Sequence, residues 1–125
     1  PIGCVITINN EVIAVGRNRC IEKNSPTQHA EINAIENACN KISNYRLINA
    51  SIYCTLEPCH MCASAIIHAR ISNLYYGASE PKTGSIKSVD NFYDKSFHNH
   101  KVIFEGGYLE KESIELLQDF FRNKR

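Results

Sequence analysis

Residues 51–69, SIYCTLEPCHMCASAIIHA, place a short strand-like run directly before a helix-like one. The run Ser51–Leu56 is rich in β-branched and aromatic residues, which predicts a strand. Pro58 suits the opening of a helix, because proline is tolerated in the first turn, and we predict that this helix runs to about Ala69. A strand that leads into a helix in this way indicates an α/β fold.

The rest of the chain continues this alternation. Residues 3–8 and 11–17 are β-rich and meet at the turn-prone pair Asn9-Asn10, so they predict a hairpin. Apolar residues at helical spacing predict a helix from His29 to about Lys41. The remaining predictions are strands over Asn73–Gly77 and Val102–Phe104, a closing helix over Glu110–Phe121, and irregular segments over 18–28 and 78–99. We therefore expect a three-layer α/β/α sandwich with a mixed five-stranded sheet, in a single domain over residues 1–125.

Composition limits the class of protein. Hydrophobic residues at 43% and charged residues at 22% are ordinary for a soluble globular chain. The sequence contains no apolar run of the roughly 18 residues that span a bilayer and does not open on a signal segment, so we expect a cytoplasmic protein with no membrane partner. A net charge of +1 neither indicates nor excludes nucleic-acid binding. On charge alone, the basic end over 122–125 is a solvated helix terminus.

Three side chains in two segments have the ligand types of a catalytic zinc site. Cys59 and Cys62 stand three residues apart at a predicted helix start, where free N–H groups and the helix dipole favour thiolates. His29 opens the other predicted helix, and two strand-to-helix crossovers in one sheet can bring their helix starts together. A catalytic zinc takes three such ligands and leaves its fourth position to water. We predict that these residues hold one zinc ion.

Glu31 stands two residues after His29 and can reach the same cavity without binding the metal. Taken alone, an acidic residue in a first helical turn is more commonly a solvated partner of the helix dipole. Beside a candidate zinc ligand the balance reverses, because a carboxylate there can take a proton from zinc-bound water and deliver it to a heterocyclic nitrogen. We predict that Glu31 is catalytic.

Two other interpretations of the cysteines remain open. A C-x-x-C pair at a helix start is also typical of thiol–disulfide redox proteins, although such a protein would not need His29-Ala30-Glu31. A structural zinc site would need a fourth ligand. The candidates for that ligand, none in a paired spacing with His29, are His60, His68, His98 and His100.

His29-x-Glu31 followed by Pro58-Cys59-x-x-Cys62 is the signature of zinc deaminases acting on cytidine, deoxycytidylate, guanine or tRNA adenosine. Over essentially its whole length the chain resembles the bacterial tRNA-specific adenosine deaminases, a family with a cytidine deaminase-like fold. Further matching stretches are Gly16–Arg19, Pro26–Glu31, Asn44–Leu47, Thr55–Cys59, Met61–Ala63, Ala69–Ile71, Pro81–Gly84, Asn99-His100 and Asp119–Arg122.

The resemblance implies a role for each matched residue. It assigns the zinc ligands to His29, Cys59 and Cys62, and the proton shuttle to Glu31. The residues that match substrate contacts are Asn18 and Ala30 for the flipped nucleoside, and Lys82, Asn99, Phe121 and Arg122 for the anticodon loop. Without the family match, Lys82 and Asn99 would be solvated loop residues, and Phe121 would equally suit the core of the closing helix.

The activity implied by the resemblance is hydrolytic deamination of the wobble adenosine of a tRNA anticodon to inosine, in an arginine tRNA. It also implies a homodimer with one Zn²⁺ per subunit that binds the anticodon stem-loop. A free-base guanine or cytosine deaminase, a structural-zinc RNA-binding module and a redox protein are the alternatives.

The chain departs from the family pattern in three places. The family usually has a helix before the first strand, and this sequence begins after that point, so we expect the leading helix to be absent from residues 1–125. Glu80 stands where an aspartate is common, which affects the expected ribose contact. Cys20 replaces a usual proline, which loosens the expected loop.

Overall fold

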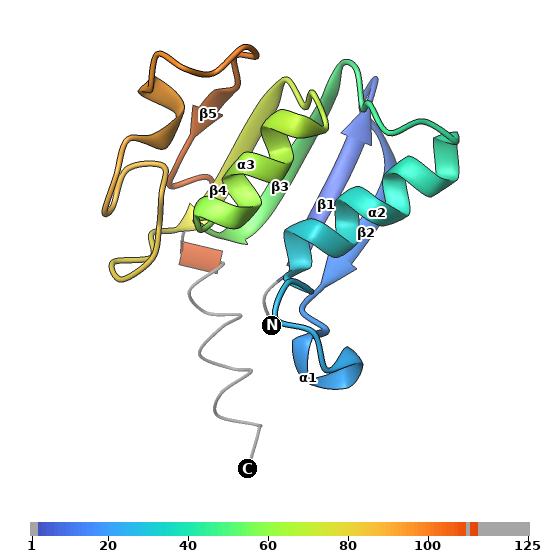
Figure 1. The fold of residues 1–125 in the computed structure, drawn as a ribbon, viewed down its shortest axis with the longest axis horizontal. Helices are drawn as coiled ribbons and strands as arrows, with labels where there is room; N and C mark the ends of the chain where they lie inside the picture. The colour runs from blue at the N-terminus through green and yellow to red at the C-terminus, as the bar shows by residue number, and fades with distance from the viewer. Residues whose placement is uncertain (1–2, 110, 113–125) are drawn as a thin grey trace.

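The computed structural model describes residues 3–109, 111 and 112 of the 125-residue chain. Five strands form one sheet in the order β2-β1-β3-β4-β5 (Figure 1). The elements are β1 Gly3–Ile8, β2 Glu11–Arg17, α1 Cys20–Lys23, α2 Ala30–Ile42, β3 Ala50–Leu56, α3 His60–His68, β4 Asn73–Ala78, the 3-10 helix η1 Phe92–Asp94 and β5 Ile103–Glu105. In the described part of the chain, no helix combines the length and the apolar character that crossing a bilayer demands.

The sheet is mixed, as the sequence predicts. Strand β1 pairs antiparallel with both β2 and β3, whereas β4 runs parallel to β3 and β5 runs parallel to β4. Because β2 and β3 both run opposite to β1, the carboxyl ends of β2, β3 and β4 lie at the same edge of the sheet. Helices α2 and α3 both begin at this edge (Figure 1).

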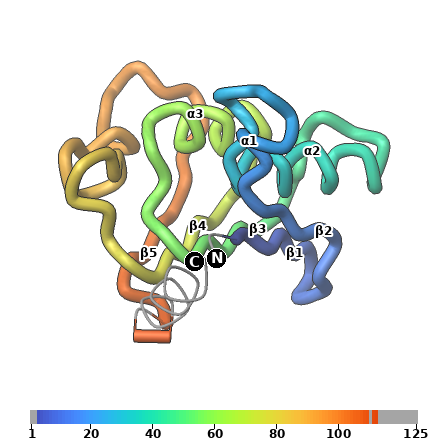
Figure 2. Tube along the Cα trace, turned by 90° about the horizontal axis from the view of Figure 1, so that it is seen from below, coloured from blue at the N-terminus to red at the C-terminus, as the bar shows by residue number. Residues whose placement is uncertain are grey.

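Helices α2 and α3 lie side by side on one face of the sheet, and the view along the sheet shows them as a single layer (Figure 2). The predicted third layer depends on the closing helix over Glu110–Phe121. Residues 111 and 112 are helical, and the rest of that segment lies outside the described residues. Apart from residues 111 and 112, the described part of the chain therefore consists of the five-stranded sheet with one layer of helices and the connecting segments.

The predicted hairpin between β1 and β2 is confirmed. Ile8 pairs with Glu11, so the loop has two residues, Asn9 and Asn10, with φ angles of 53° and 64°. Two central residues with positive φ make a type I′ turn, whose twist matches that of the strands it joins, and asparagine tolerates this conformation well.

The core lies between the sheet and the two helices. Alternate residues of each strand face the helices, as the period of a strand requires. The buried core residues of these elements are Cys4, Ile6, Ala50, Ile52, Cys54, Leu74, Tyr76 and Ala78 from the sheet and Ala30, Ala34, Ala38, Cys62, Ala63, Ile66 and Ile67 from the helices. The small alanines of α2 allow the helix backbone to approach the sheet closely.

That approach makes Gly16 in β2 intolerant of any side chain. A Cβ atom at Gly16 would lie 2.8 Å from Ala34 Cα and would overlap the backbone of Ala30. Helix backbone cannot turn aside as a side chain can, so we expect Gly16→Ala to lower the free energy of unfolding by about 1–3 kcal/mol, as overpacking does. Urea unfolding measures this change.

Gly3→Ala is the matched control, because a Cβ atom at Gly3 would make only an ordinary 3.6 Å contact with the carbonyl oxygen of Gly16. Equal stability of the two variants would show that α2 does not pack on β2 as closely as described.

The expectation that residues 18–28 form only a loop is wrong, because they contain helix α1. The Asn18 side-chain oxygen accepts a hydrogen bond from the Cys20 N–H at 3.0 Å and so starts the turn. Glu22 then pairs with Arg19 and with Arg17. Asn24, in the left-handed conformation, ends the helix after one turn. Such local polar contacts have no hydrophobic period, so the sequence pattern does not predict them.

Helix α3 begins later than predicted. Its first residue is His60 and Cys59 is the N-cap, so Pro58 lies before the helix and not in its first turn. The Pro58 carbonyl instead accepts hydrogen bonds from the N–H and the hydroxyl of Ser85.

Smaller differences concern the strand ends and one loop. Strand β4 extends to Ala78 and β5 covers Ile103–Glu105 instead of Val102–Phe104. The segment 78–99, expected to be irregular throughout, contains the short helix η1.

Candidate metal centre and substrate pocket

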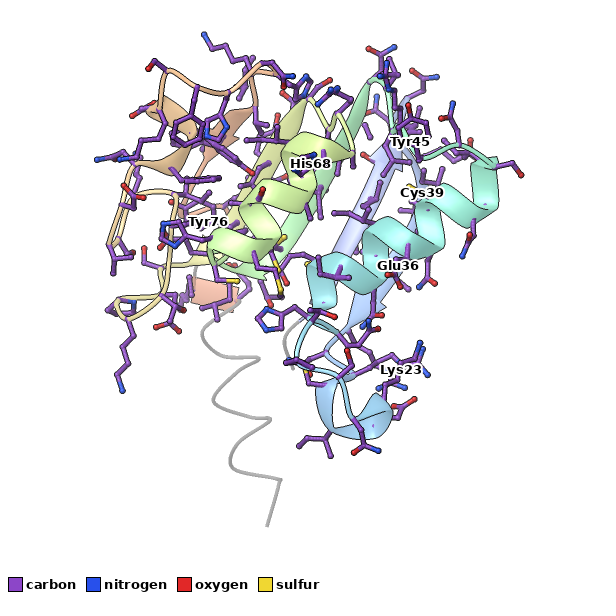
Figure 3. The ribbon with its side chains drawn as sticks, in the orientation of Figure 1. Lys23, Glu36, Cys39, Tyr45, His68 and Tyr76 are labelled. Atoms are coloured by element: carbon purple, nitrogen blue, oxygen red, sulfur yellow. The ribbon has the colours of Figure 1, made fainter. Side chains whose placement is uncertain are left out.

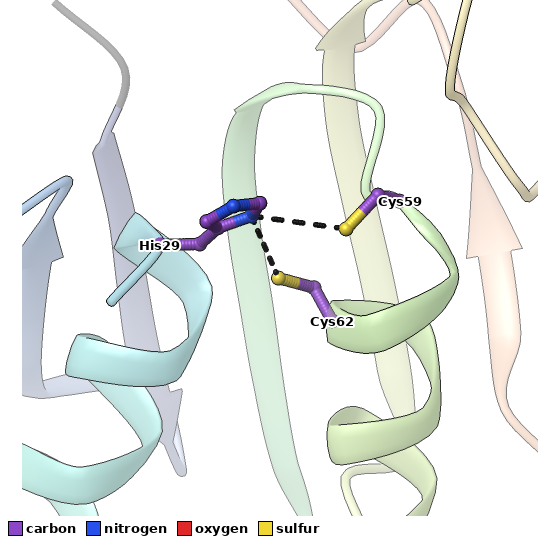
Figure 4. A group of neighbouring side chains, drawn as sticks. All are labelled: His29, Cys59 and Cys62. Carbon is purple, nitrogen blue, oxygen red and sulfur yellow. Dashed lines mark hydrogen bonds between the residues drawn. The ribbon is translucent and has the colours of Figure 1, made fainter. Parts of the chain in front are cut away.

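Two helix starts bring together His29, Cys59 and Cys62. His29 is the N-cap residue of α2, Cys59 is the N-cap residue of α3, and Cys62 lies in the first turn of α3. The Nδ1 atom of His29 lies 3.7 Å from Cys59 Sγ and 3.5 Å from Cys62 Sγ (Figure 4). These ligand atoms all lie within 4.8 Å of one another, so the group can hold a metal ion.

The distances suit a tetrahedral metal ion bound by one nitrogen and two sulfurs. Zinc–nitrogen and zinc–sulfur bonds of ordinary length, at a tetrahedral angle, would separate the ligand nitrogen from each sulfur by about 3.6 Å. The separations of 3.5 and 3.7 Å from His29 to the two thiols agree with this value. The donor set and its spacing therefore fit zinc.

Within the described residues this group has three protein ligands, and no fourth His, Cys, Asp or Glu joins it. Three of the histidines considered as a fourth ligand have other contacts. His60 pairs with Asp90 at 2.9 Å, and His98 and His100 contact the carbonyl oxygens of Phe92 and Ile71. The group therefore resembles an open metal site more closely than a closed structural one.

The two thiols differ in their ease of ionisation. The hydrogen bond from the Cys62 thiol lowers the pKa of Cys59 to about 5, with help from nearby backbone N–H groups and from His29, and burial opposes this effect. The same hydrogen bond raises the pKa of Cys62, and burial adds to the rise. The thiolate form is thus favoured at Cys59, and a bound cation would favour it at Cys62 as well.

Glu31 lies in the first turn of α2 and is buried, with 6% of its surface exposed. Burial raises the pKa of its carboxyl group, and the nearby charge of Cys59 acts in the same direction. The hydrogen bonds from its own N–H and from Cys62, together with His29, oppose the rise. This is not the environment of a solvated helix-dipole residue, because Glu31 is buried and lines the same pocket as His29 and Cys59.

A small pocket of about 110 Å³ opens beside the metal group. It is lined by Asn18, His29, Ala30, Glu31, Leu56, Glu57, Cys59 and Thr83. A larger cavity of about 730 Å³ lies on the opposite face of the sheet, where Val5, Tyr53 and Tyr75 point away from the helices. We assign the function to the smaller pocket, because polar and metal-binding groups converge there.

Asn33 holds one wall of this pocket in place. Its buried side-chain amide donates hydrogen bonds to the carbonyl oxygens of Arg17, at 2.8 Å, and Gln28, at 3.2 Å. These two residues flank the segment that begins with Asn18 and leads into His29. Asn33 therefore fixes both ends of the segment from within α2.

Only some of the residues predicted to contact substrate line the pocket. Asn18 and Ala30 line the pocket with Glu31. Lys82 is exposed next to the pocket residue Thr83, and its backbone N–H donates to the Glu80 carboxylate at 2.9 Å. Asn99 is exposed in the segment between η1 and β5. Phe121 and Arg122 lie outside the described residues.

Sequence reasoning missed Leu56, Glu57 and Thr83 as pocket residues. Glu57 is 3% exposed and accepts hydrogen bonds from the chain around residues 80–88. Burial acts to raise the pKa of its carboxyl group, but hydrogen bonds, the largest from the Lys87 N–H, together lower it. The sequence signal for Glu57 was an acidic residue between a predicted strand and Pro58, because a carboxylate buried there needs hydrogen-bond or charged partners.

Comparison with known proteins identifies the family of the chain. The family model of the MafB19-like deaminases matches residues 1–125. The tRNA-specific adenosine deaminase of Agrobacterium fabrum is 46% identical over 125 residues, covering 100% of this chain and 82% of that protein. The chain belongs to the tRNA-specific adenosine deaminase family. As a member of this family it is an enzyme, and the resemblance inferred from its motifs is confirmed.

Solved structures agree with this assignment to the tRNA-specific adenosine deaminases. A structure from work on A-to-I editing by tRNA:A34 deaminases at the wobble position superposes with a TM-score of 0.89 at 45% identity, covering 93% of this chain and 84% of the other. The guanine deaminase of Bacillus subtilis superposes with a TM-score of 0.64 at 31% identity, covering 100% and 83%. The predicted cytidine deaminase-like α/β fold is confirmed.

Proposed function

We propose that this protein hydrolyses the amino group of adenosine at the wobble position of a tRNA anticodon and leaves inosine. The observation that carries the proposal is the buried Glu31 beside the three-ligand group of His29, Cys59 and Cys62. The relatives that are named for action on tRNA adenosine support the choice of substrate. An arginine tRNA is the substrate that the family resemblance implies.

His29, Cys59 and Cys62 would hold one zinc ion per subunit. Zinc, when bound, supplies a nucleophile from water at neutral pH by lowering the pKa of that water. The group opens onto the pocket lined by Asn18 and Glu31, so water could reach a metal ion held there.

Glu31 would carry the protons of the reaction. Its carboxylate accepts the proton of the attacking water as the oxygen adds to C6 of adenine, and passes that proton to N1 of the ring. Glu31 then takes the remaining proton of the oxygen added at C6 and delivers it to the departing amino group. The C6–N bond breaks as the C6 carbonyl forms, so that water and adenosine become inosine and ammonia. Burial of Glu31 keeps bulk water from competing with these transfers.

The pocket would accept a base that has left its stack. A duplex hides C6 of adenine, so the substrate must be a loop or single-stranded nucleoside that can be splayed into the site. Asn18 would hold the flipped nucleoside and the Ala30 backbone would contact the base. Lys82, Asn99, Phe121 and Arg122 would contact the surrounding anticodon loop.

The proposed assembly is a cytoplasmic homodimer with one anticodon stem-loop at each site. The family resemblance supports this arrangement, and cytoplasm is where the tRNA substrate resides. Sedimentation of the purified protein would report a mass of two chains, and a single-chain mass would contradict the dimer.

One experiment separates the proposed activity from the alternatives. The zinc-loaded protein is incubated with an anticodon hairpin that carries adenosine at the wobble position, with the same hairpin whose adenosine is moved into the paired stem, and with free guanine and cytosine. We expect inosine, read as guanosine after reverse transcription, in the first hairpin alone.

The other outcomes favour other functions. Ammonia from guanine or cytosine in the absence of RNA would favour a free-base deaminase, which the likeness to a guanine deaminase makes the second candidate. Binding of the hairpin without conversion of the base would favour an RNA-binding module.

A further inference from the structure

The buried carboxylate of Glu57 accepts hydrogen bonds from both ends of the loop over residues 80–88. Glu57 accepts from the N–H groups of Ile86, Lys87 and Ser88 at 3.0, 2.8 and 3.0 Å through one oxygen. Through the other oxygen it accepts from the Glu80 N–H at 3.1 Å and from the Ser88 hydroxyl. The four N–H groups come from both ends of the segment 80–88, so one side chain fixes the start and the end of this loop.

Further contacts draw the same loop onto the chain around Glu57. The Pro58 carbonyl accepts hydrogen bonds from the N–H of Ser85, at 2.9 Å, and from its hydroxyl, at 3.0 Å. Gly84 packs directly against the Glu57 carboxylate, where a Cβ atom would overlap it and would lie 2.6 Å from the Glu80 carbonyl oxygen. Gly84, Ser85 and Ile86 are buried as a result.

One exposed residue of this loop lines the pocket. Thr83 is part of the same pocket lining as Asn18, and Lys82 precedes it on the surface. Within the described part of the chain, positions 80–88 belong to no helix or strand. The position of Thr83 therefore depends on the hydrogen bonds to Glu57, which stands two residues before the metal-group residue Cys59.

We propose that Glu57 is a positioning residue that holds the 80–88 loop as one wall of the nucleoside pocket, and that it sets substrate affinity without taking part in the chemistry. This inference rests on the proposed function for its substrate. It assigns to Glu57 a role different from that of Glu31, although both carboxylates are buried at the same pocket.

The test is Glu57→Gln, which keeps the shape of the side chain but replaces one acceptor oxygen with a donor NH₂ group. Two or three of the five donors then lose their acceptor. We expect exchange of the 86–88 amide hydrogens to quicken roughly 10–100-fold, the range that follows from unsatisfied buried donors. We also expect KM for the anticodon hairpin to rise about tenfold, while kcat and the zinc content stay near those of the unmodified protein.

Gly84→Ala provides an independent second variant, since its Cβ atom would displace the loop from Glu57 without changing any charge. It should raise KM in the same way. Asn33→Ala is the control for general destabilisation in the exchange experiment, because it removes two partly buried hydrogen bonds, to Arg17 and Gln28, that do not involve the 80–88 loop. It should leave exchange of the 86–88 amides unchanged.

Each outcome bears on the proposal. A lower kcat with unchanged KM would reveal a smaller folded fraction and would overturn the positioning role, as would unchanged amide exchange in Glu57→Gln. If the unmodified protein converts no hairpin adenosine, the proposed function fails. The exchange result still decides whether Glu57 holds the loop.

Discussion

Glu31→Gln is expected to lower kcat for adenosine deamination by about 10²–10⁴-fold, the usual contribution of a general acid–base group. The glutamine side chain has nearly the same shape but can neither accept the proton of the attacking water nor pass it to the ring. Because Glu31 lies beside the metal ligands without belonging to their group, the bound zinc should remain at one per chain. Single-turnover inosine formation and metal analysis on the same sample measure both quantities.

Glu36→Gln is the matched control, because Glu36 is an exposed glutamate further along the same helix (Figure 3). It should react at the rate of the unmodified protein. Equal rates for Glu31→Gln and Glu36→Gln would remove the proton-shuttle role from Glu31.

Cys62→Ala is expected to abolish inosine formation together with tight zinc binding. Cys62 is fully buried and its sulfur lies 3.5 Å from His29 Nδ1, so the substitution leaves two ligands and a gap. Loss of a residue that hydrogen-bonds to a metal ligand lowers metal affinity by about 10–100-fold, and loss of a ligand itself should lower it further. Competition with a chromophoric chelator measures the affinity.

Cys39→Ala is the control here, since Cys39 is a thiol of helix α2 that packs at the edge of the core and does not join the metal group (Figure 3). It should bind one zinc ion and remain active. Full zinc affinity in Cys62→Ala would mean that another residue supplies the third ligand.

The sequence predicts the sheet and the two principal helices because their signals are periodic or carried by strong local residues. Apolar residues at helical spacing mark α2, and Asn9-Asn10 marks the hairpin turn. Hydrophobic periodicity does not predict the metal group. The group was predicted from ligand types, because a histidine and a C-x-x-C pair stand at two helix starts that the fold brings together. The direction of β2 relative to β3 makes this possible, because the strand ends lie at one edge.

What the sequence did not predict depends on contacts between distant segments or on local polar contacts that have no periodic pattern. Glu57 gains its role from loop amides that lie about 30 positions further along the chain, and a backbone N–H group has no sequence signature. Helix α1 depends on Asn18 and on the ion pairs of Glu22, which have no periodic pattern. The residue type of Pro58 predicts a position in the first turn of a helix. In the structure Pro58 lies before α3, and its carbonyl oxygen accepts a hydrogen bond from Ser85.

The most direct test of the central claim is a titration of the metal-free protein with zinc while inosine is measured in the anticodon hairpin. The claim predicts no inosine without metal and a linear rise that ends at one zinc ion per chain, with His29, Cys59 and Cys62 as the ligands. Inosine formed by the metal-free protein, or a protein that holds one zinc ion and leaves the wobble adenosine unchanged, would contradict it.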